Sequence, residues 1–161
     1  MAQIFADVVT SSSTTKLYKL GTFRHEASSG KDYRYVQVSA SSAGACANGT
    51  VMLNTGSAGT SDFVVSDDVS ANKQNDVIGV GVGAIAKSSY GWIQVYGSHA
   101  AIKTDGGDDI ADGDGLIQSA TGDGECDSVA AGTALTHKGI GFATAADVDS
   151  QDTVAAFITL G

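Results

Sequence analysis

Cysteine and histidine are scarce in this chain of 161 residues. Its two cysteines, Cys46 and Cys126, stand 80 positions apart and outside any CxxC or Cys/His cluster. None of the three histidines, His25, His99 and His137, has a second histidine two to five positions away. Zinc sites need such closely spaced thiolate and imidazole ligands, so no zinc site is predicted. We expect two isolated, buried thiols rather than a disulfide.

No apolar run is long enough to cross a membrane as a helix. The longest mostly apolar stretch, residues 77–86, covers ten positions and is interrupted by glycines, whereas a membrane helix needs about 20 residues. Residues 1–7 lack the basic region and apolar core of a secretory signal. We therefore expect a product that stays in the cytoplasm in which it is made, unless something else carries it out.

Basic residues are also few. Nine Lys and Arg stand against 18 Asp and Glu, which gives a net charge of −9. Residues 1–60 carry +2 and residues 61–161 carry −11. Binding to DNA or RNA through phosphates needs a basic face, so this balance argues against a nucleic-acid partner. Solubility alone is enough to explain the acidic surface.

Good helix formers are under-represented. Leu, Glu, Met, Gln, Lys and Arg total 25, whereas the β-branched residues Val, Ile and Thr total 38. Asp outnumbers Glu by 16 to 2, and there are 21 glycines. This composition favours strands joined by turns. We therefore predict an all-β fold, either a small β-barrel or a β-sandwich-like domain, with an extended N-terminal segment.

Alternation of side chains predicts a clear strand at residues 33–38. Asn48-Gly49 is a strong signal for a tight turn. The only weak helical signal lies near residues 70–75, and no repeat of fixed period is visible. Further strands are expected at residues 51–53, 63–65, 99–103, 115–118, 138–144 and 153–160.

The centre of the chain predicts a β-hairpin in which residues 77–86 pair with residues 90–97. The expected register pairs are Ile85 with Trp92, Gly83 with Gln94, and Gly81 with Tyr96. In this register, large rings lie over bare glycine backbone and cover it. The rings belong to Tyr90, Trp92 and Tyr96. Their face is either an exposed subunit interface, where Trp and Tyr are enriched, or a second packed face.

Residues 1–22 differ from the rest of the chain. Apolar residues near the start are followed by a polar, flexible run at residues 10–15. The segment is either an edge strand with its loop or an extended arm that adds a strand to a partner's sheet. The candidate contact residues of such an arm are Ile4, Phe5, Val8 and Val9. Residues 23–161 are expected to form a single β domain.

No pattern of catalytic residues emerges. The chain has neither a GxSxG nucleophile elbow nor a GxxxxGK[ST] phosphate loop. The acidic stretch at residues 105–115 offers carboxylates to calcium, but it lacks the closing glutamate and the glycine position of an EF-hand. A solvated acidic loop is the preferred interpretation. The sequence therefore predicts no enzyme activity, no cofactor and no metal.

The order of several segments resembles a known family. The segments are Val77-Ile78-Gly79-Val80, Gly91-Trp92-Ile93-Gln94-Val95-Tyr96-Gly97, Asp112-Gly113-Asp114-Gly115-Leu116, Gly139-Ile140-Gly141-Phe142-Ala143 and residues 154–160. Together they resemble the small head decoration, or capsid cement, proteins of tailed bacteriophages. The resemblance covers roughly residues 75–161, and the first half carries no motif of that family.

The resemblance implies a β-barrel-like protein that assembles as a homotrimer on the outer capsid surface of a virion. Its partner would be the major capsid protein, which the trimer clamps after the shell expands, and no nucleic acid or membrane is involved. In this scheme the N-terminal arm binds the capsid, and the Trp92 face joins the protomers. A carbohydrate- or receptor-binding β module, in which Tyr90, Trp92 and Tyr96 stack on sugar rings, and a small hydrolase or isomerase are the alternatives.

Overall fold

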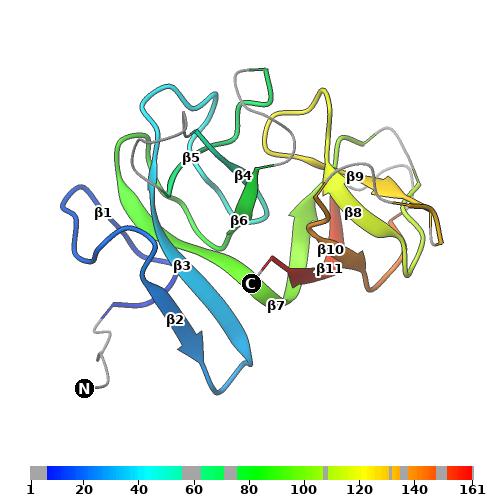
Figure 1. Ribbon diagram of the computed structural model, residues 1–161, viewed down its shortest axis with the longest axis horizontal. Coiled ribbons are helices and arrows are strands. Elements are labelled where there is room, and N and C mark those ends of the chain that lie inside the picture. Colours follow the sequence, from blue (N-terminus) through cyan, green and yellow to red (C-terminus); the bar gives the residue numbers. More distant parts are fainter. Residues whose placement is uncertain are drawn as a thin grey trace.

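The structure is all-β. The computed structural model describes residues 7–55, 63–70, 76–106, 109–130, 132–134, 138–147 and 152–160. Within these residues there is no helix, and eleven strands join one continuous sheet (Figure 1). The all-β prediction is therefore confirmed, in its barrel form.

The strands are short except for one. In chain order they are β1 (Ser12–Ser13), β2 (Phe23–Glu26), β3 (Lys31–Val38), β4 (Val51–Asn54), β5 (Val64–Ser66), β6 (Val77–Gly81), β7 (Tyr90–Lys103), β8 (Gly115–Gln118), β9 (Cys126–Val129), β10 (Gly141–Ala143) and β11 (Thr153–Thr159). Their order in the sheet is β2-β3-β5-β4-β6-β7-β11-β10-β8-β9, and β1 pairs with β7. The 14-residue β7 lies in the middle of this order and pairs with β3 as well as with β6 and β11.

A first barrel closes on itself. It consists of β3, β5, β4, β6 and β7, and it is closed because β3 pairs with β7 as well as with β5. Its apolar interior contains Val36, Val38, Cys46, Met52, Val65, Ile85 and Ile93. A Cβ on Gly79 would lie 2.7 Å from Cδ1 of Ile93, so this position leaves no room for a side chain.

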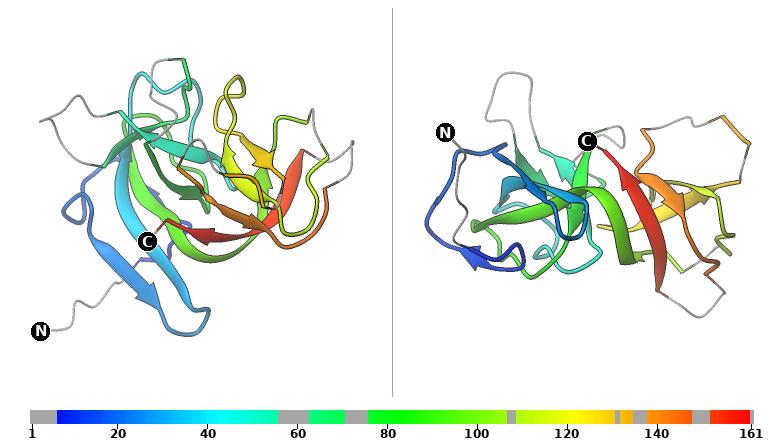
Figure 2. Two further views of the ribbon diagram at one scale, coloured as in Figure 1. Left: turned by 45° about the vertical axis from the view of Figure 1, so that its right-hand side comes forward. Right: turned by 90° about the horizontal axis from the view of Figure 1, so that it is seen from below.

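A second ring of five strands begins where the first barrel ends. β7 continues past the first barrel and pairs with β11, and β10, β8 and β9 follow in order. A parallel bridge between Thr104, which follows β7, and Cys126 in β9 brings the ring back to its start. We call this ring the second barrel. Figure 2 shows β7 passing from one barrel into the other.

The two barrels have the same topology. In each, the first strand pairs in parallel with the third and antiparallel with the fifth, and the second strand lies between the third and the fourth. β7 is the fifth strand of the first barrel and the first strand of the second. The matching register pairs are Met52–Gly79 and Leu116–Gly141 between second and fourth strands, and Val80–Gln94 and Phe142–Phe157 between fourth and fifth strands.

The turn before the second strand also repeats. In the first barrel, the Thr50 amide donates to the Ala47 carbonyl at 3.2 Å, and the Ala47 amide donates to the Thr50 hydroxyl at 3.1 Å. In the second barrel, the Asp114 amide donates to the Ala111 carbonyl at 3.1 Å, and the Ala111 amide donates to the Asp114 carboxylate at 3.0 Å. The glycines with positive φ in these turns are Gly49 (80°) and Gly113 (90°). The structure is thus one five-strand unit used twice.

The second barrel buries one outer face of the first. The apolar residues of that face, Val51, Leu53, Val77 and Val80, belong to the same cluster as the interior of the second barrel. Backbone hydrogen bonds join the two, from the Val51 amide to the Gly124 carbonyl at 2.8 Å and from the Lys103 amide to the Gly49 carbonyl at 3.0 Å. The barrels therefore form one packed body.

Most predicted strands are present. Those expected at residues 33–38, 51–53, 63–65, 115–118, 138–144 and 153–160 overlap β3, β4, β5, β8, β10 and β11. The prediction missed β1, β2 and β9, and it split β7 in two, because Gly97 reads as a break. Gly97 instead sits within the strand at a φ of 98°. The weak helical signal falls largely on residues 71–75, which lie outside the described residues.

The predicted register of the central hairpin is wrong. β6 ends at Gly81, which pairs with Ile93 and not with the predicted tyrosine. The chain then leaves β7, and Ile85 bridges to Cys46 inside the first barrel. A Cβ on Gly81 would lie 2.6 Å from Sγ of Cys46. The glycines of β6 therefore make room for atoms of their own barrel, not for covering rings.

Both cysteines are free and buried, as expected, with one in each barrel. Burial, together with the nearby Asp67 carboxylate, raises the pKa of Cys46 to about 12. Burial, together with the nearby carboxylates of Asp105 and Asp127, likewise raises the pKa of Cys126 to about 12. Because the thiolate is the reactive form, both thiols should be inert in the folded protein.

Alkylation tests this arrangement. Iodoacetamide at mildly alkaline pH should leave the intact mass of the folded protein unchanged, because both thiols are buried and protonated. The same treatment in guanidinium should add one adduct at Cys46 and one at Cys126, measured by peptide mass spectrometry. An adduct on either residue in the folded protein would contradict the buried placement.

Candidate interaction surfaces

The N-terminal segment is fastened to the first barrel at Asp7. One carboxylate oxygen accepts a hydrogen bond from Trp92 Nε1 at 2.7 Å, and the other accepts one from the Tyr18 hydroxyl at 2.7 Å. Arg24 donates to the Asp7 carbonyl at 2.8 Å. Partial burial acts to raise the pKa of Asp7, but the hydrogen bonds from Tyr18 and Trp92 outweigh it, so the net pKa lies below the ordinary value. Asp7 is thus held as a carboxylate that fixes the chain at this point.

Trp92 lies under this segment and not on a surface. Its side chain is fully buried. Tyr35 packs edge-on against it with ring centroids 5.1 Å apart, and Tyr18 lies at 5.4 Å. Trp92 was predicted to lie in a subunit interface, and within one chain residues of the N-terminal segment and of β3 already cover its ring.

Tyr90 and Tyr96 lie in different surroundings. Tyr90 is half-buried and stacks on Tyr35 at 6.3 Å. Tyr96 is 41% exposed. Asp32 and Tyr33 of β3 pair with Tyr96 and Gln94, so Val95 is an extra residue in β7 and turns Tyr96 away from the Trp92 side. The three rings predicted to share one interface are therefore divided between a buried cluster and an exposed position.

The N-terminal segment behaves as an edge of the sheet from Asp7 onward. Ser12 and Ser13 of β1 pair with the beginning of β7. Val9 packs against the cluster around Trp92, whereas Val8 is 66% exposed. The other two candidate arm residues, Ile4 and Phe5, lie outside the described residues. Of the two predicted arm residues that the structure describes, Val8 is the exposed one.

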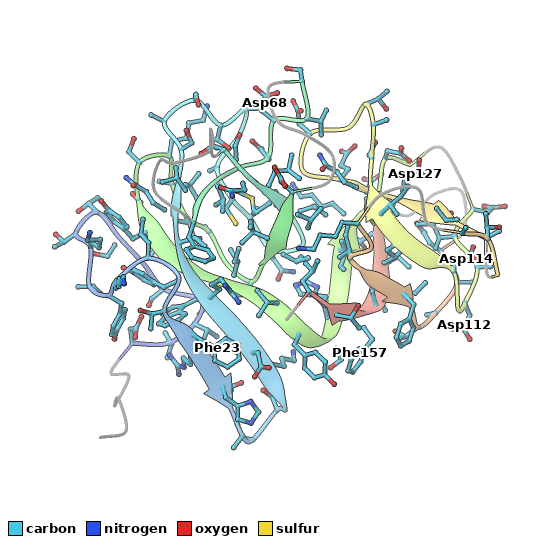
Figure 3. All side chains as sticks on the ribbon, in the orientation of Figure 1. Phe23, Asp68, Asp112, Asp114, Asp127 and Phe157 are labelled. Atoms are coloured by element: carbon cyan, nitrogen blue, oxygen red, sulfur yellow. The ribbon has the colours of Figure 1, made fainter. Side chains whose placement is uncertain are left out.

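An exposed group of aromatic side chains lies on the second barrel. We call it the aromatic face, and it consists of Tyr96 on β7, Phe142 on β10 and Phe157 on β11. Phe142 stacks on Phe157 at 5.7 Å, and Tyr96 meets Phe157 edge-on at 5.2 Å. Phe142 is 45% exposed and Phe157 is half-buried. In Figure 3, Phe157 points away from the strands, below β7 and β11.

Alternation along β11 would have located part of this face. Val154, Ala156 and Ile158 point into the second barrel, so Phe157 between them must point outward. Sequence reasoning predicted a strand here but did not single out the exposed ring of Phe157. Tyr96 was identified, but with the wrong neighbours.

An acidic cavity of about 380 Å³ lies at one end of the second barrel. It is lined by Lys103, Thr104, Asp105, Glu125, Asp152 and Thr153. Burial and the nearby Asp105 raise the pKa of Glu125. Among the residues that the structure describes, no three His, Cys, Asp or Glu side chains are placed to hold a metal ion. The acidic loop that precedes β8 is described except for residues 107–108.

The two described histidines have structural partners. His25 Nδ1 lies 2.6 Å from the Asp32 carboxylate at an exposed site. His99 is buried: its Nδ1 accepts from the Ala101 amide at 3.2 Å, and its Nε2 donates to the Gly81 carbonyl at 3.1 Å. Neither ring hydrogen-bonds a serine or cysteine in this part of the chain. His137 lies outside the described residues.

Comparison with known proteins does not add a relative. No family model, no curated protein and no solved structure matches the chain. In the described residues, no helix is long and apolar enough to cross a membrane.

The buried His99 predicts a pH dependence of stability. Burial lowers its pKa below the ordinary value, so the unfolded chain binds the proton more tightly. The free energy of unfolding should therefore decrease as the pH falls through about 6.5. Urea unfolding of the wild type and of His99→Gln, compared at pH 7.5 and pH 5.5, isolates this contribution. An equal loss of stability in both proteins would contradict it.

Proposed function

We propose that this protein is a capsid decoration, or cement, protein that binds the outer surface of a phage head and stabilises the expanded lattice as a homotrimer. The resemblance that suggests this role lies in segments that include β6, the first part of β7, β10 and most of β11. They include the first part of β7, the strand that both barrels share, and strands close to it in the sheet. The proposal places the protein on the virion, with the major capsid protein as its partner.

The observation that carries the proposal is the placement of the exposed apolar side chains. In the described residues the large ones are Val8, Leu17, Phe23, Tyr96 and Phe142. The protein is strongly acidic. The two histidines that the structure describes, His25 and His99, have partners within the fold. Exposed apolar groups of this kind are typical of surfaces that bind other proteins. A binding role therefore fits these surfaces better than a catalytic one.

The N-terminal arm is the proposed capsid contact. Asp7 fixes the chain to the first barrel, and the exposed Val8 lies directly beside this anchor. Asp7 therefore gives the proposed arm a fixed point of attachment. An extended segment that adds a strand to a capsid sheet makes many backbone hydrogen bonds without a preformed pocket. Ile4 and Phe5 would supply the apolar contacts.

Stabilisation of the shell follows from linkage. A protein that binds only the expanded lattice shifts the equilibrium toward that lattice by mass action. A trimer has three arms, and after the first arm has bound, the other two bind at a high effective concentration. Weak single contacts therefore add up to a firm clamp.

The carbohydrate-binding alternative loses its main residue. It requires Trp92 in an open groove with Tyr90 and Tyr96, but Trp92 is buried beneath the N-terminal segment. Buried rings cannot stack on a sugar. Tyr96 alone does not form the predicted platform.

Deletion of residues 2–6 tests the arm. The shortened protein keeps Asp7, so its melting temperature and the fluorescence of Trp92 should be unchanged. Its capture by empty, expanded phage heads in a pelleting assay should fall at least tenfold, because the proposed strand is missing. The matched control, Thr14→Ala with Thr15→Ala, alters exposed polar residues of the same segment and should pellet normally. Full capture of the deletion variant would rule out the arm.

A further inference from the structure

The repeated unit reveals which outer face of the second barrel is incomplete. In the first barrel, Val80 and Gln94 form a register pair on a face that is completely buried. Their equivalents in the second barrel are Phe142 and Phe157. This equivalent pair belongs to the aromatic face, where Phe142 remains exposed. The same pair of positions is thus buried in the first barrel and partly exposed in the second.

The cover of the first face comes from the next unit in the chain. Val80 belongs to one cluster with Val154 and Ile158 of the second barrel. Among the described residues, none covers Phe142 in the same way, and its side chain remains 45% exposed. A face that is built like a covered one, but carries larger apolar side chains, is suited to receive another protein surface.

We infer that the aromatic face binds a second copy of this chain, and that the contact is head to tail. The inference deepens the proposed function, because it assigns the surface that holds the homotrimer together. It replaces the buried Trp92 as the centre of that contact and keeps Tyr96.

Charge determines the direction of the contact. Residues 98–160 carry 11 acidic residues and two lysines, a net charge of −9, whereas residues 1–55 carry five basic and three acidic residues, a net charge of +2. Two aromatic faces placed together would bring two strongly acidic halves into contact, which like-charge repulsion opposes. An acidic half against the basic end of another copy is attractive.

The basic end also has exposed apolar side chains. Leu17 is 54% exposed and Phe23 is 48% exposed, and the lysines Lys16 and Lys19 flank Leu17 at exposed positions. We call this group the basic end. At the aromatic face, the carbonyl of Ala143, the residue after Phe142, accepts a hydrogen bond from the Gly113 amide at 3.1 Å. The exposed Asp112 precedes Gly113 in this turn and so lies near the aromatic face. Each copy thus offers exposed apolar side chains in its acidic half and others in its basic half. Such heterologous contacts close into a ring when the rotation allows.

Two variants of the full chain test the inference. The face variant is Tyr96→Ser with Phe142→Ser, and the end variant is Leu17→Ser with Phe23→Ser. Light scattering should give about three times 16.2 kDa for the wild type and 16.2 kDa for each variant alone. An equimolar mixture of the two variants should give a dimer, because one intact face then meets one intact basic end.

Three results would overturn the inference. They are a monomeric wild type at the highest soluble concentration, a face variant that still forms trimers, and an end variant that still associates through its face alone. Phe142→Asp repeats the test with a single exposed substitution, in case the double variant unfolds. The control Val8→Ser should remain trimeric. No capsid is present in these measurements, so a wild-type monomer that still pellets with phage heads would refute this contact while leaving capsid binding intact.

Discussion

The structure depends on one strand that belongs to two barrels. β7 closes the first barrel against β3 and opens the second against β11. At the crossover, the Gln94 side-chain amide donates to the carbonyls of Tyr96, Gly97 and Ser98 at 3.0–3.1 Å, which holds the backbone at the point where it changes barrels. Neither barrel can open along β7 without disturbing the other. The buried His99 adds a hydrogen bond from β7 to the end of β6.

The sequence was sufficient for the fold class and for strands with regular alternation. β3 was predicted from alternation, and in β11 the inward residues Val154, Ala156 and Ile158 are apolar at every second position. The register of β6 could not be predicted, since its glycines carry no side chain that prefers either face. The repeat was hidden for two reasons. Few positions are identical, such as Gly79 with Gly141, and the spacing drifts from 66 residues between Val38 and Thr104 to 61 between Val65 and Cys126.

The positions of the candidate interaction residues could likewise be predicted only in part from the sequence. Trp92 and Tyr96 lie at positions of equal parity in β7, and alternation assigns them to one face. The extra residue Val95 breaks that alternation, and no local signal in the sequence marks it. The hydrogen-bond acceptor of Trp92 Nε1 is Asp7, 85 residues away, which a pattern of neighbours cannot identify. By contrast, Phe157 was within reach of sequence reasoning, because its neighbours in β11 alternate regularly.

Hydrogen exchange along β7 tests the central claim most directly. If one strand holds two barrels in a single cooperative body, the slowly exchanging amides of its first part, residues 91–96, and of its second part, residues 98–103, should open with the same free energy. That free energy should equal the global free energy of unfolding measured with denaturant. A second part that exchanges through its own, much smaller opening free energy would contradict the account, because the second barrel would then fold and unfold independently of the first.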